Sequence, residues 1–255
     1  MAAQEGQTRS PSARRVALVT GASSGIGFAI AAMLAAEGYD LTVVSRTPEK
    51  LERAAAEIVA HGTAVHPVPA DLTDAEQIAA VAAAHREHFG RLDVLVNNAG
   101  MGIHAELDDY RLKQVDMQLA LNLRSVLLFY KETLDLLRVA AAEHRNALVI
   151  NMSSVVGKRG AAGLGVYSAA KHGVVGFTEA MNAELSGEGI KSCVLCPGFV
   201  DTDLAEYSQN PTPAEEMIRP GDVAESARAL LRLSPTCVVP EIVMTRPGRE
   251  AVVSG

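Results

Sequence analysis

The chain of 255 residues contains no tryptophan, only three cysteines and no apolar run approaching the ~18 residues of a membrane-spanning helix. We therefore expect a soluble protein with no membrane partner. Its net charge of −7 is not offset by any basic stripe, which disfavours a nucleic acid as partner. The polar opening lacks the apolar core of a signal peptide, so we expect residues 1–13 to be a disordered tail and the protein to be cytoplasmic.

The few metal-binding residue types form no convincing site. An odd number of cysteines disfavours a disulfide scaffold. Cys193 and Cys196 form a CxxC motif within a predicted strand, where residues three apart point to opposite faces, so we expect buried structural thiols. His85 and His88 lie three apart on a predicted helix without a third ligand. Because AHREHFG is typical of a solvated helix end, we expect no metal.

Short, apolar, β-branched runs alternate with amphipathic stretches along the whole chain. This pattern predicts an α/β fold, a single doubly wound Rossmann-type domain over residues 14–255 whose parallel sheet is flanked by helices. The seven predicted strands, expected to be buried on both faces, are 16–20, 41–45, 64–68, 92–96, 147–151, 192–196 and 241–245. The predicted helices are 25–37, 48–60, 74–89, about 106–142 and 164–187.

A glycine-rich turn, GASSGIG, joins the first predicted strand to the first helix. At such a turn, backbone N–H groups and the helix dipole can hold a pyrophosphate. Its spacing, G-x-x-x-G-x-G, differs from the G-x-G-x-x-G fingerprint, so an ordinary glycine-rich turn is the alternative reading of this motif alone. The candidate cofactor residues are Gly21, Ser23, Ser24, Gly25, Ile26 and Gly27.

The end of the second predicted strand indicates which dinucleotide would bind. NAD-binding proteins usually carry an acidic residue there to hold the ribose hydroxyls. The nearest acid, Asp40, lies at the other end of the strand, roughly 17 Å away. Arg46 instead offers a guanidinium for a 2′-phosphate, with Ser45 beside it, so we expect NADP(H) over NAD(H); a solvated surface arginine is the alternative.

Polar residues also follow the third and fourth predicted strands. The carboxylate of Asp71 can accept a hydrogen bond from an adenine amino group, or it can help to cap the next helix. The motif NNAG at 97–100 is suited to bracing neighbouring strands and a ribose, although a plain Asn/Gly turn is the alternative. The candidate cofactor contacts in this motif are Asn98, Ala99 and Gly100.

The chemistry is carried by Ser154, after the fifth strand, and by Tyr167 and Lys171, four apart on one helix face. A free tyrosine titrates near pH 10, and a neighbouring ammonium, helped by an oxidised nicotinamide, would favour its phenolate and lower its pKa. Ser154 can then donate a hydrogen bond to a substrate carbonyl oxygen. No histidine or acid stands at a recognisable triad signature that would make this serine a nucleophile.

Together these motifs resemble those of the short-chain dehydrogenase/reductase family over about residues 14–204. TGASSGIG has the glycine spacing of that family's cofactor turn, and NNAG is similar to its central motif. Ser154, Tyr167 and Lys171 match its catalytic set. The resemblance adds Asn122 as a fourth catalytic residue that holds a relay water. It assigns to the cofactor Asp71, Leu72, Tyr167, Lys171, Pro197, Gly198, Val200 and Thr202.

The resemblance implies an oxidoreductase that interconverts a ketone or aldehyde and an alcohol, acting as a homodimer or homotetramer. Reduction of 3-oxoacyl thioesters and a non-catalytic, NADP-sensing regulatory protein are the alternatives. The C-terminus lacks the Asp-Gly-Gly stretch of many relatives, which makes a role in fatty-acid synthesis less expected. We expect a substrate lid around 203–220 and, from the family geometry, an apolar pocket lined by Val155, Val156, Met101, Leu164 and Phe199.

Overall fold

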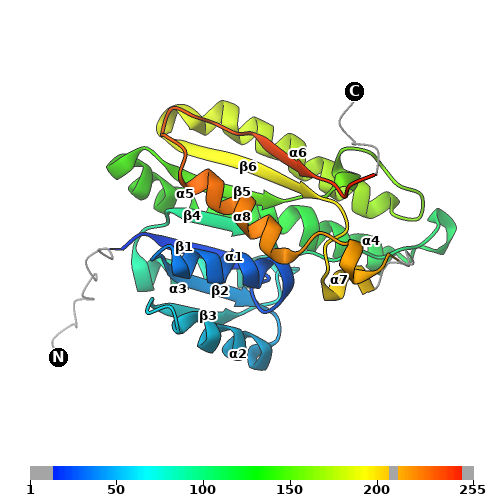
Figure 1. The fold of residues 1–255 in the computed structure, drawn as a ribbon, viewed down its shortest axis with the longest axis horizontal. Helices are drawn as coiled ribbons and strands as arrows, with labels where there is room; N and C mark the ends of the chain where they lie inside the picture. The colour runs from blue at the N-terminus through cyan, green and yellow to red at the C-terminus, as the bar shows by residue number, and fades with distance from the viewer. Residues whose placement is uncertain (1–13, 207–211, 249–255) are drawn as a thin grey trace.

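The computed structural model describes residues 14–206 and 212–248, so the predicted N-terminal tail lies outside the described residues. The strands are β1 (Val16–Thr20), β2 (Asp40–Ser45), β3 (Val65–Pro69), β4 (Val94–Asn97), β5 (Ala147–Met152), β6 (Ile190–Pro197) and β7 (Glu241–Met244). They form one parallel sheet in the order β3-β2-β1-β4-β5-β6-β7 (Figure 1). The predicted doubly wound α/β fold class is confirmed.

The prediction that all seven strands are buried on both faces holds only for the middle of the sheet. Every residue of β1, β2, β4, β5 and β6 is buried, whereas β3 and β7 are partly exposed. These two strands are the sheet edges (Figure 1), each paired on one side only. Apolar composition alone does not distinguish an edge strand from a central one.

Helices cover both faces of the sheet. One face carries α1 (Gly25–Ala36), α2 (Pro48–Val59) and α8 (Pro220–Leu231), and the other carries α3 (Ala75–Phe89), α5 (Ser125–His144) and α6 (Gly165–Leu185). Alternation along β1 explains the two layers, because Ala17 and Val19 pack with the first set and Leu18 packs with the second. The sequence did not predict α8, although Pro220 stands in its first turn and Asp222 accepts from the backbone N–H of Arg219 at 3.1 Å.

The helix predicted at 106–142 is wrong as one continuous element. The chain instead forms a 3₁₀ turn, η1 (Leu107–Asp109), then α4 (Leu112–Leu119), a π-helical turn, η2 (Ala120–Arg124), and α5. Single π turns inside a helix interrupt the regular bonding ladder and are frequent at functional sites. Here the interruption falls on Asn122, whose side chain bonds the backbone of a neighbouring loop.

His85 is buried, so its expected place on a solvated helix end is wrong. Its Nε2 donates to the carbonyl oxygen of Arg91 at 2.9 Å, and the Thr42 hydroxyl lies 2.7 Å from Nδ1. Burial lowers the pKa of His85 to about 4, so the ring is neutral. Within residues 14–206 and 212–248, no three His, Cys, Asp or Glu side chains are grouped to hold a metal, and no helix is long and apolar enough to cross a membrane.

The two cysteines of the CxxC motif lie on opposite faces of the sheet, as expected. Cys193 packs in the core shared with α1 and α8, whereas Cys196 packs with Val126 and Val174 on the other side. Burial raises the pKa of Cys193 to about 12 and that of Cys196 to about 11. Both therefore stay as thiols at neutral pH, which supports their structural role.

Candidate functional site

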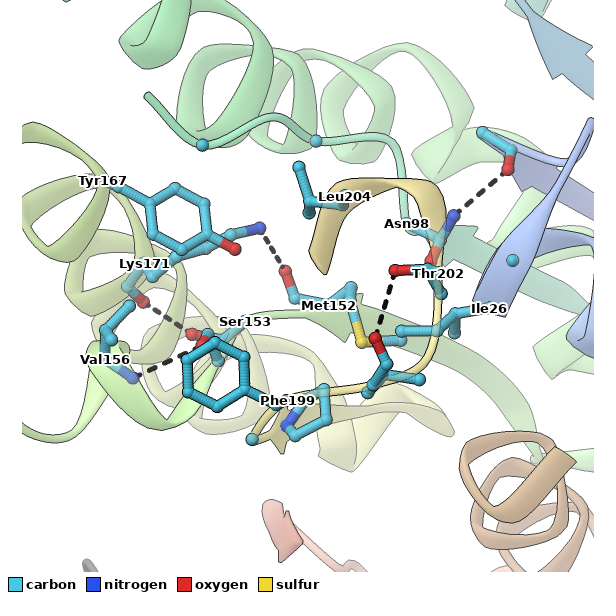
Figure 2. A pocket seen from close by; sticks show the side chains of 18 of the residues that line it. Ile26, Asn98, Met152, Ser153, Val156, Tyr167, Lys171, Phe199, Thr202 and Leu204 are labelled. Carbon is cyan, nitrogen blue, oxygen red and sulfur yellow. Dashed lines mark hydrogen bonds between the residues drawn. The ribbon is translucent and has the colours of Figure 1, made fainter. Parts of the chain in front are cut away.

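A cavity of about 610 Å³ opens at the carboxyl ends of β1, β4, β5 and β6. This is the place where strand order reverses, between β1 and β4, and where doubly wound sheets bind ligands. Figure 2 shows Tyr167 and Lys171 on one side of the cavity, and Asn98 and Ile26 on the other. The cavity thus brings together predicted residues that are far apart in the sequence.

The glycine turn forms one wall of this cavity, and its backbone requires glycine. Gly21 and Gly25 have φ of +66° and +56°, in the left-handed region that favours glycine. A Cβ on Gly27 would lie 2.2 Å from the carbonyl oxygen of Gly21, and a Cβ on Gly25 would lie 2.9 Å from Thr202 Cγ2. The turn therefore packs tightly on itself and presents the N-terminus of α1 to the cavity.

The central NNAG motif braces strands, as the sequence predicts. The side chain of Asn97 donates to that of Asn151 at 2.8 Å, which links β4 to β5. Asn98 Nδ2 donates to the carbonyl oxygen of Thr20 at 3.0 Å and to that of Gly21 at 3.3 Å, which fixes the glycine turn. Asn98, Ala99 and Gly100 all line the cavity.

Ser154, Tyr167 and Lys171 line the opposite wall. Ser154 follows β5 and begins the short turn η3 (Val155–Gly157). Tyr167 and Lys171 lie on α6, with the ammonium nitrogen 5.5 Å from the centre of the tyrosine ring. Lys171 Nζ donates to the carbonyl oxygen of Met152 at 2.8 Å, so the ammonium is tied to the end of β5 (Figure 2).

The protein's own groups do not lower the pKa of Tyr167, and the lowered pKa expected from the sequence also involved an oxidised nicotinamide. Burial raises the pKa of Tyr167 to about 12, and the nearby Ser154 side chain opposes this rise only in part. Burial also lowers the pKa of Lys171 to about 8. Burial is the larger of the two effects on the pKa of Tyr167. At neutral pH the phenol therefore keeps its proton.

Asn122 lies behind the cavity wall rather than in it. Its Oδ1 accepts from the backbone N–H of Met101 at 3.0 Å, and its Nδ2 donates to the carbonyl oxygens of Met101 and Gln118 at 2.8 and 2.9 Å. A Cβ on Gly100 would lie 2.8 Å from Asn122 Oδ1 and 3.5 Å from Lys171 Nζ, so the carboxamide is close to the lysine. One lone pair of Oδ1 remains for a water.

Four predicted cofactor residues lie at the ends of β2 and β3, outside the cavity lining. Arg46 is exposed, and the neighbouring hydroxyl of Ser45 is buried without a hydrogen-bond partner among the described residues. Leu72 is buried. Asp71 Oδ1 accepts from the backbone N–H and hydroxyl of Thr73 at 2.9 and 2.8 Å, while Asp74 caps α3. Asp71 therefore shapes a local turn and is not the helix cap.

The segment from Pro197 to Thr202 closes the cavity and is held by the C-terminal part of the chain. The backbone N–H of Gly198 donates to the carbonyl oxygen of Met244 at 2.9 Å, and Val200 forms a parallel bridge with Ile218. The lid expected around 203–220 is described only in part, as α7 (Asp203–Glu206) and η5 (Ala214–Glu216), because residues 207–211 lie outside the described part of the chain.

Several cavity residues were not predicted from the sequence. Four of the five expected pocket residues line it, but Met101 does not. Additional lining residues lie at the end of β5, in the loops after β4 and β5, and at the start of α7, where the expected lid begins. They are Gly102, His104, Met152, Ser153, Ala162, Asp203 and Leu204.

Comparison with known proteins places this site in a family. Residues 15–212 match the family model described as short chain dehydrogenase. One relative, from Streptomyces violaceoruber, is named as ketoacyl reductase 1 of the granaticin polyketide synthase. It is 42% identical over 202 residues, which cover 78% of this chain and 72% of that protein. Levodione reductase from Leifsonia aquatica is 37% identical, covering 82% of this chain and 81% of its own length.

A solved structure extends the similarity to three dimensions. Actinorhodin polyketide ketoreductase, as a variant with NADPH, superposes with a TM-score of 0.82 at 32% identity, covering 90% of this chain and 95% of that chain. The protein belongs to the short chain dehydrogenase family. It is therefore an oxidoreductase enzyme, as its sequence motifs predicted.

Proposed function

We propose that the protein is an NADP(H)-dependent oxidoreductase that interconverts a ketone or aldehyde and the corresponding alcohol. The observation that carries this proposal is the convergence of Ser154, Tyr167 and Lys171 on one cavity whose other wall is the glycine turn. A dinucleotide fits this arrangement, because the N-terminus of α1, at which Ser24 makes no side-chain cap, faces the cavity and can bind phosphate through its backbone N–H groups. The cavity volume is also that of an ordinary cofactor site.

When bound, the nicotinamide supplies the hydride in reduction and accepts it in oxidation. Ser154 donates a hydrogen bond to the substrate carbonyl oxygen and stabilises the negative charge that develops there. Tyr167 gives its phenolic proton to the same oxygen in reduction and takes it back in oxidation. The raised pKa of Tyr167 supports the first of these roles, because the proton to be donated is present at neutral pH.

Lys171 serves two purposes in this proposal. One ammonium hydrogen is engaged with Met152, which leaves two for ribose hydroxyls. Its positive charge favours the phenolate that remains on Tyr167 after proton donation. After this step Lys171 gives a proton to the Tyr167 phenolate and takes one back from a water. Asn122 fixes the backbone at Met101 and orients this water through its remaining lone pair.

Arg46 supports NADP(H) as the preferred cofactor. It stands exposed at the carboxyl end of β2 beside the unpartnered Ser45 hydroxyl, whereas Asp40 lies at the opposite end of that strand. A guanidinium and a hydroxyl together suit a 2′-phosphate. The NADPH in the similar actinorhodin ketoreductase agrees with this assignment.

The test is a screen for NADPH oxidation over small ketones, aldehydes, quinones, steroids and 3-oxoacyl thioesters. Turnover of at least one carbonyl compound, lost in Tyr167→Phe, is expected. The relatives named as ketoacyl reductases favour a second candidate, reduction of acyl thioesters. A large preference for a 3-oxoacyl thioester over every free carbonyl compound would select that candidate, and no turnover with any of them would refute the proposal.

A further inference from the structure

Beyond the reacting groups, the substrate end of the cavity is almost wholly apolar. We define this end by the lining residues Val155, Val156, Ala162, Leu164, Phe199 and Leu204. Two polar side chains interrupt it, the imidazole of His104 and the carboxylate of Asp203. An apolar pocket with a few placed polar groups fixes the orientation of its ligand through those groups.

His104 is seated against a glycine that leaves room for its ring. A Cβ on Gly163 would lie 2.3 Å from His104 Nε2 and 2.4 Å from Cε1. The backbone of Ala105 donates to the carbonyl oxygen of Gly163 at 2.9 Å, which joins the two loops beside the ring. Any side chain at position 163 would displace the imidazole.

The backbone just before His104 is also fixed. The N–H of Ile103 donates to Gln118 Oε1 at 3.0 Å, and the carbonyl oxygen of Ile103 accepts from the hydroxyl of Tyr110 at 2.9 Å. Gln118 is fully buried and lies one helical turn before Asn122. The loop that carries His104 is therefore held by α4, which continues directly into the π-helical turn that contains Asn122.

This loop passes close to the reacting group. A Cβ on Gly102 would lie 3.9 Å from Cδ2 of Tyr167. His104 follows two residues later, within about 7 Å of chain from Gly102. Its imidazole makes no hydrogen bond or ion pair with any residue in 14–206 or 212–248, although it is exposed to the cavity. It is available to a ligand group in the cavity that Ser154 and Tyr167 also line.

We propose that His104 is a specificity-determining residue that donates an imidazole N–H to a second, uncharged oxygen of the substrate. The substrate class is a carbonyl compound with a further carbonyl close to the reacting one, such as a 3-oxo ester, a 3-oxo thioester or a diketone. Asp203 also lines the cavity and adds a negative charge there, which disfavours a carboxylate in the substrate. This inference rests on the proposed carbonyl reductase function and names its substrate class.

The test compares two substrates of similar length, ethyl 3-oxobutanoate and heptan-2-one, of which only the first carries the second oxygen. The measured quantity is the ratio of their kcat/KM values with NADPH. His104→Ala is expected to lower this ratio about tenfold, because one hydrogen bond is lost only with the oxo ester. His104→Gln retains an N–H donor and is expected to recover part of the ratio.

Two further variants separate recognition from packing. Gly163→Ala is expected to lower the ratio by displacing the imidazole, but to change it little when combined with His104→Ala. Leu164→Ala, a control on the same wall, is expected to affect both substrates alike. An unchanged ratio in His104→Ala, or an equal loss on both substrates, would overturn this inference while leaving the reductase function intact. Absence of NADPH oxidation with every carbonyl compound would instead refute the reductase function, and this inference with it.

Discussion

The ammonium nitrogen of Lys171 lies 2.8 Å from the carbonyl oxygen of Met152, the last residue of β5. In the opposite direction, the hydroxyl of Ser153 donates to the carbonyl oxygen of Lys171 at 2.9 Å. Helix α6 is thus joined to the end of β5 through both the side-chain ammonium and the backbone carbonyl of Lys171. The buried ammonium is held by backbone oxygen rather than by a carboxylate, so its burial is only partly compensated.

Replacing Lys171 should stabilise the ligand-free protein near neutral pH. Its pKa is lowered to about 8, so folding costs free energy wherever the unfolded lysine is charged. The shift corresponds to roughly 3 kcal/mol, and loss of the bond to Met152 offsets about 1 kcal/mol of the gain. Lys171→Met is expected to raise the free energy of unfolding by about 2 kcal/mol at pH 7 in urea titrations.

The stability gained in Lys171→Met should depend on pH. The cost is complete below pH 8 and disappears as the pH rises toward the unfolded value near 10.5, so the advantage of Lys171→Met should shrink over that interval. Lys191 is a matched control, since burial also lowers its pKa but it bonds Ser234 and Cys237 far from the cavity. Lys191→Met should leave NADPH affinity unchanged. A Lys171→Met protein less stable than wild type at pH 7 would contradict the argument.

Tyr167→Phe should remove nearly all turnover, because the proton donor is lost while the ring remains. A positioned acid contributes about 10²- to 10⁴-fold, so kcat is expected to fall by that range with NADPH affinity little changed. Tyr130→Phe is the control, as it removes a buried hydroxyl that bonds Ser192 outside the cavity. Near-normal kcat in Tyr167→Phe would exclude the assigned role.

Arg46→Asp should shift cofactor preference from NADPH toward NADH. A lost charge-assisted contact, together with repulsion of the 2′-phosphate, is expected to change the ratio of kcat/KM values by about 10- to 100-fold. In the wild-type protein, raised ionic strength should lower the preference for NADPH over NADH, because salt screens the contact between Arg46 and the 2′-phosphate. Arg53→Asp provides a control of equal charge change on the exposed side of α2. Equal cofactor ratios in the two variants would remove Arg46 from the phosphate site.

Gly27→Ala should damage the cofactor turn, because the added Cβ would meet the Gly21 carbonyl oxygen at 2.2 Å. Overpacking of this kind costs about 1–3 kcal/mol, and NADPH affinity should fall at least tenfold in fluorescence titrations. Gly176 is an exposed residue of α6, and a Cβ added there would meet no other atom within 4 Å. Gly176→Ala is therefore expected to stabilise the protein by about 1 kcal/mol and to leave binding intact, and similar behaviour of the two variants would contradict the packing argument.

The parts of this fold that could be predicted are those determined by hydrophobic periodicity and capping residues within one segment. The strands and most helix ends follow from period and capping residues, as at Pro48 and Gly90. The break around Asn122 could not be predicted, because the bonds that cause it join the helix to Met101, more than twenty positions away in the chain.

The same distinction applies to the site. The sequence alone could identify Ser154, Tyr167 and Lys171, because their residue types and spacing indicate a chemical role. His104 carries none in its own segment, and its place is defined by Gly163 on another loop. The protonation of Tyr167 could not be predicted either, since it depends on how far the folded chain removes the phenol from water. Contacts between loops and degree of burial are properties of the assembled chain.

The support of Gly198 by Met244 has a consequence for biosynthesis. Chains are synthesised from the N-terminus, and a domain generally folds as a unit. The glycine turn, Ser154 and Tyr167 therefore all leave the ribosome before β7, whose Met244 fixes Gly198 and whose Glu241 pairs with Lys158 at 2.8 Å. A nascent chain that already contains Ser154 and Tyr167 still lacks the residue that holds Gly198 at the wall of the cavity. This wall can therefore be completed only after β7 has been synthesised.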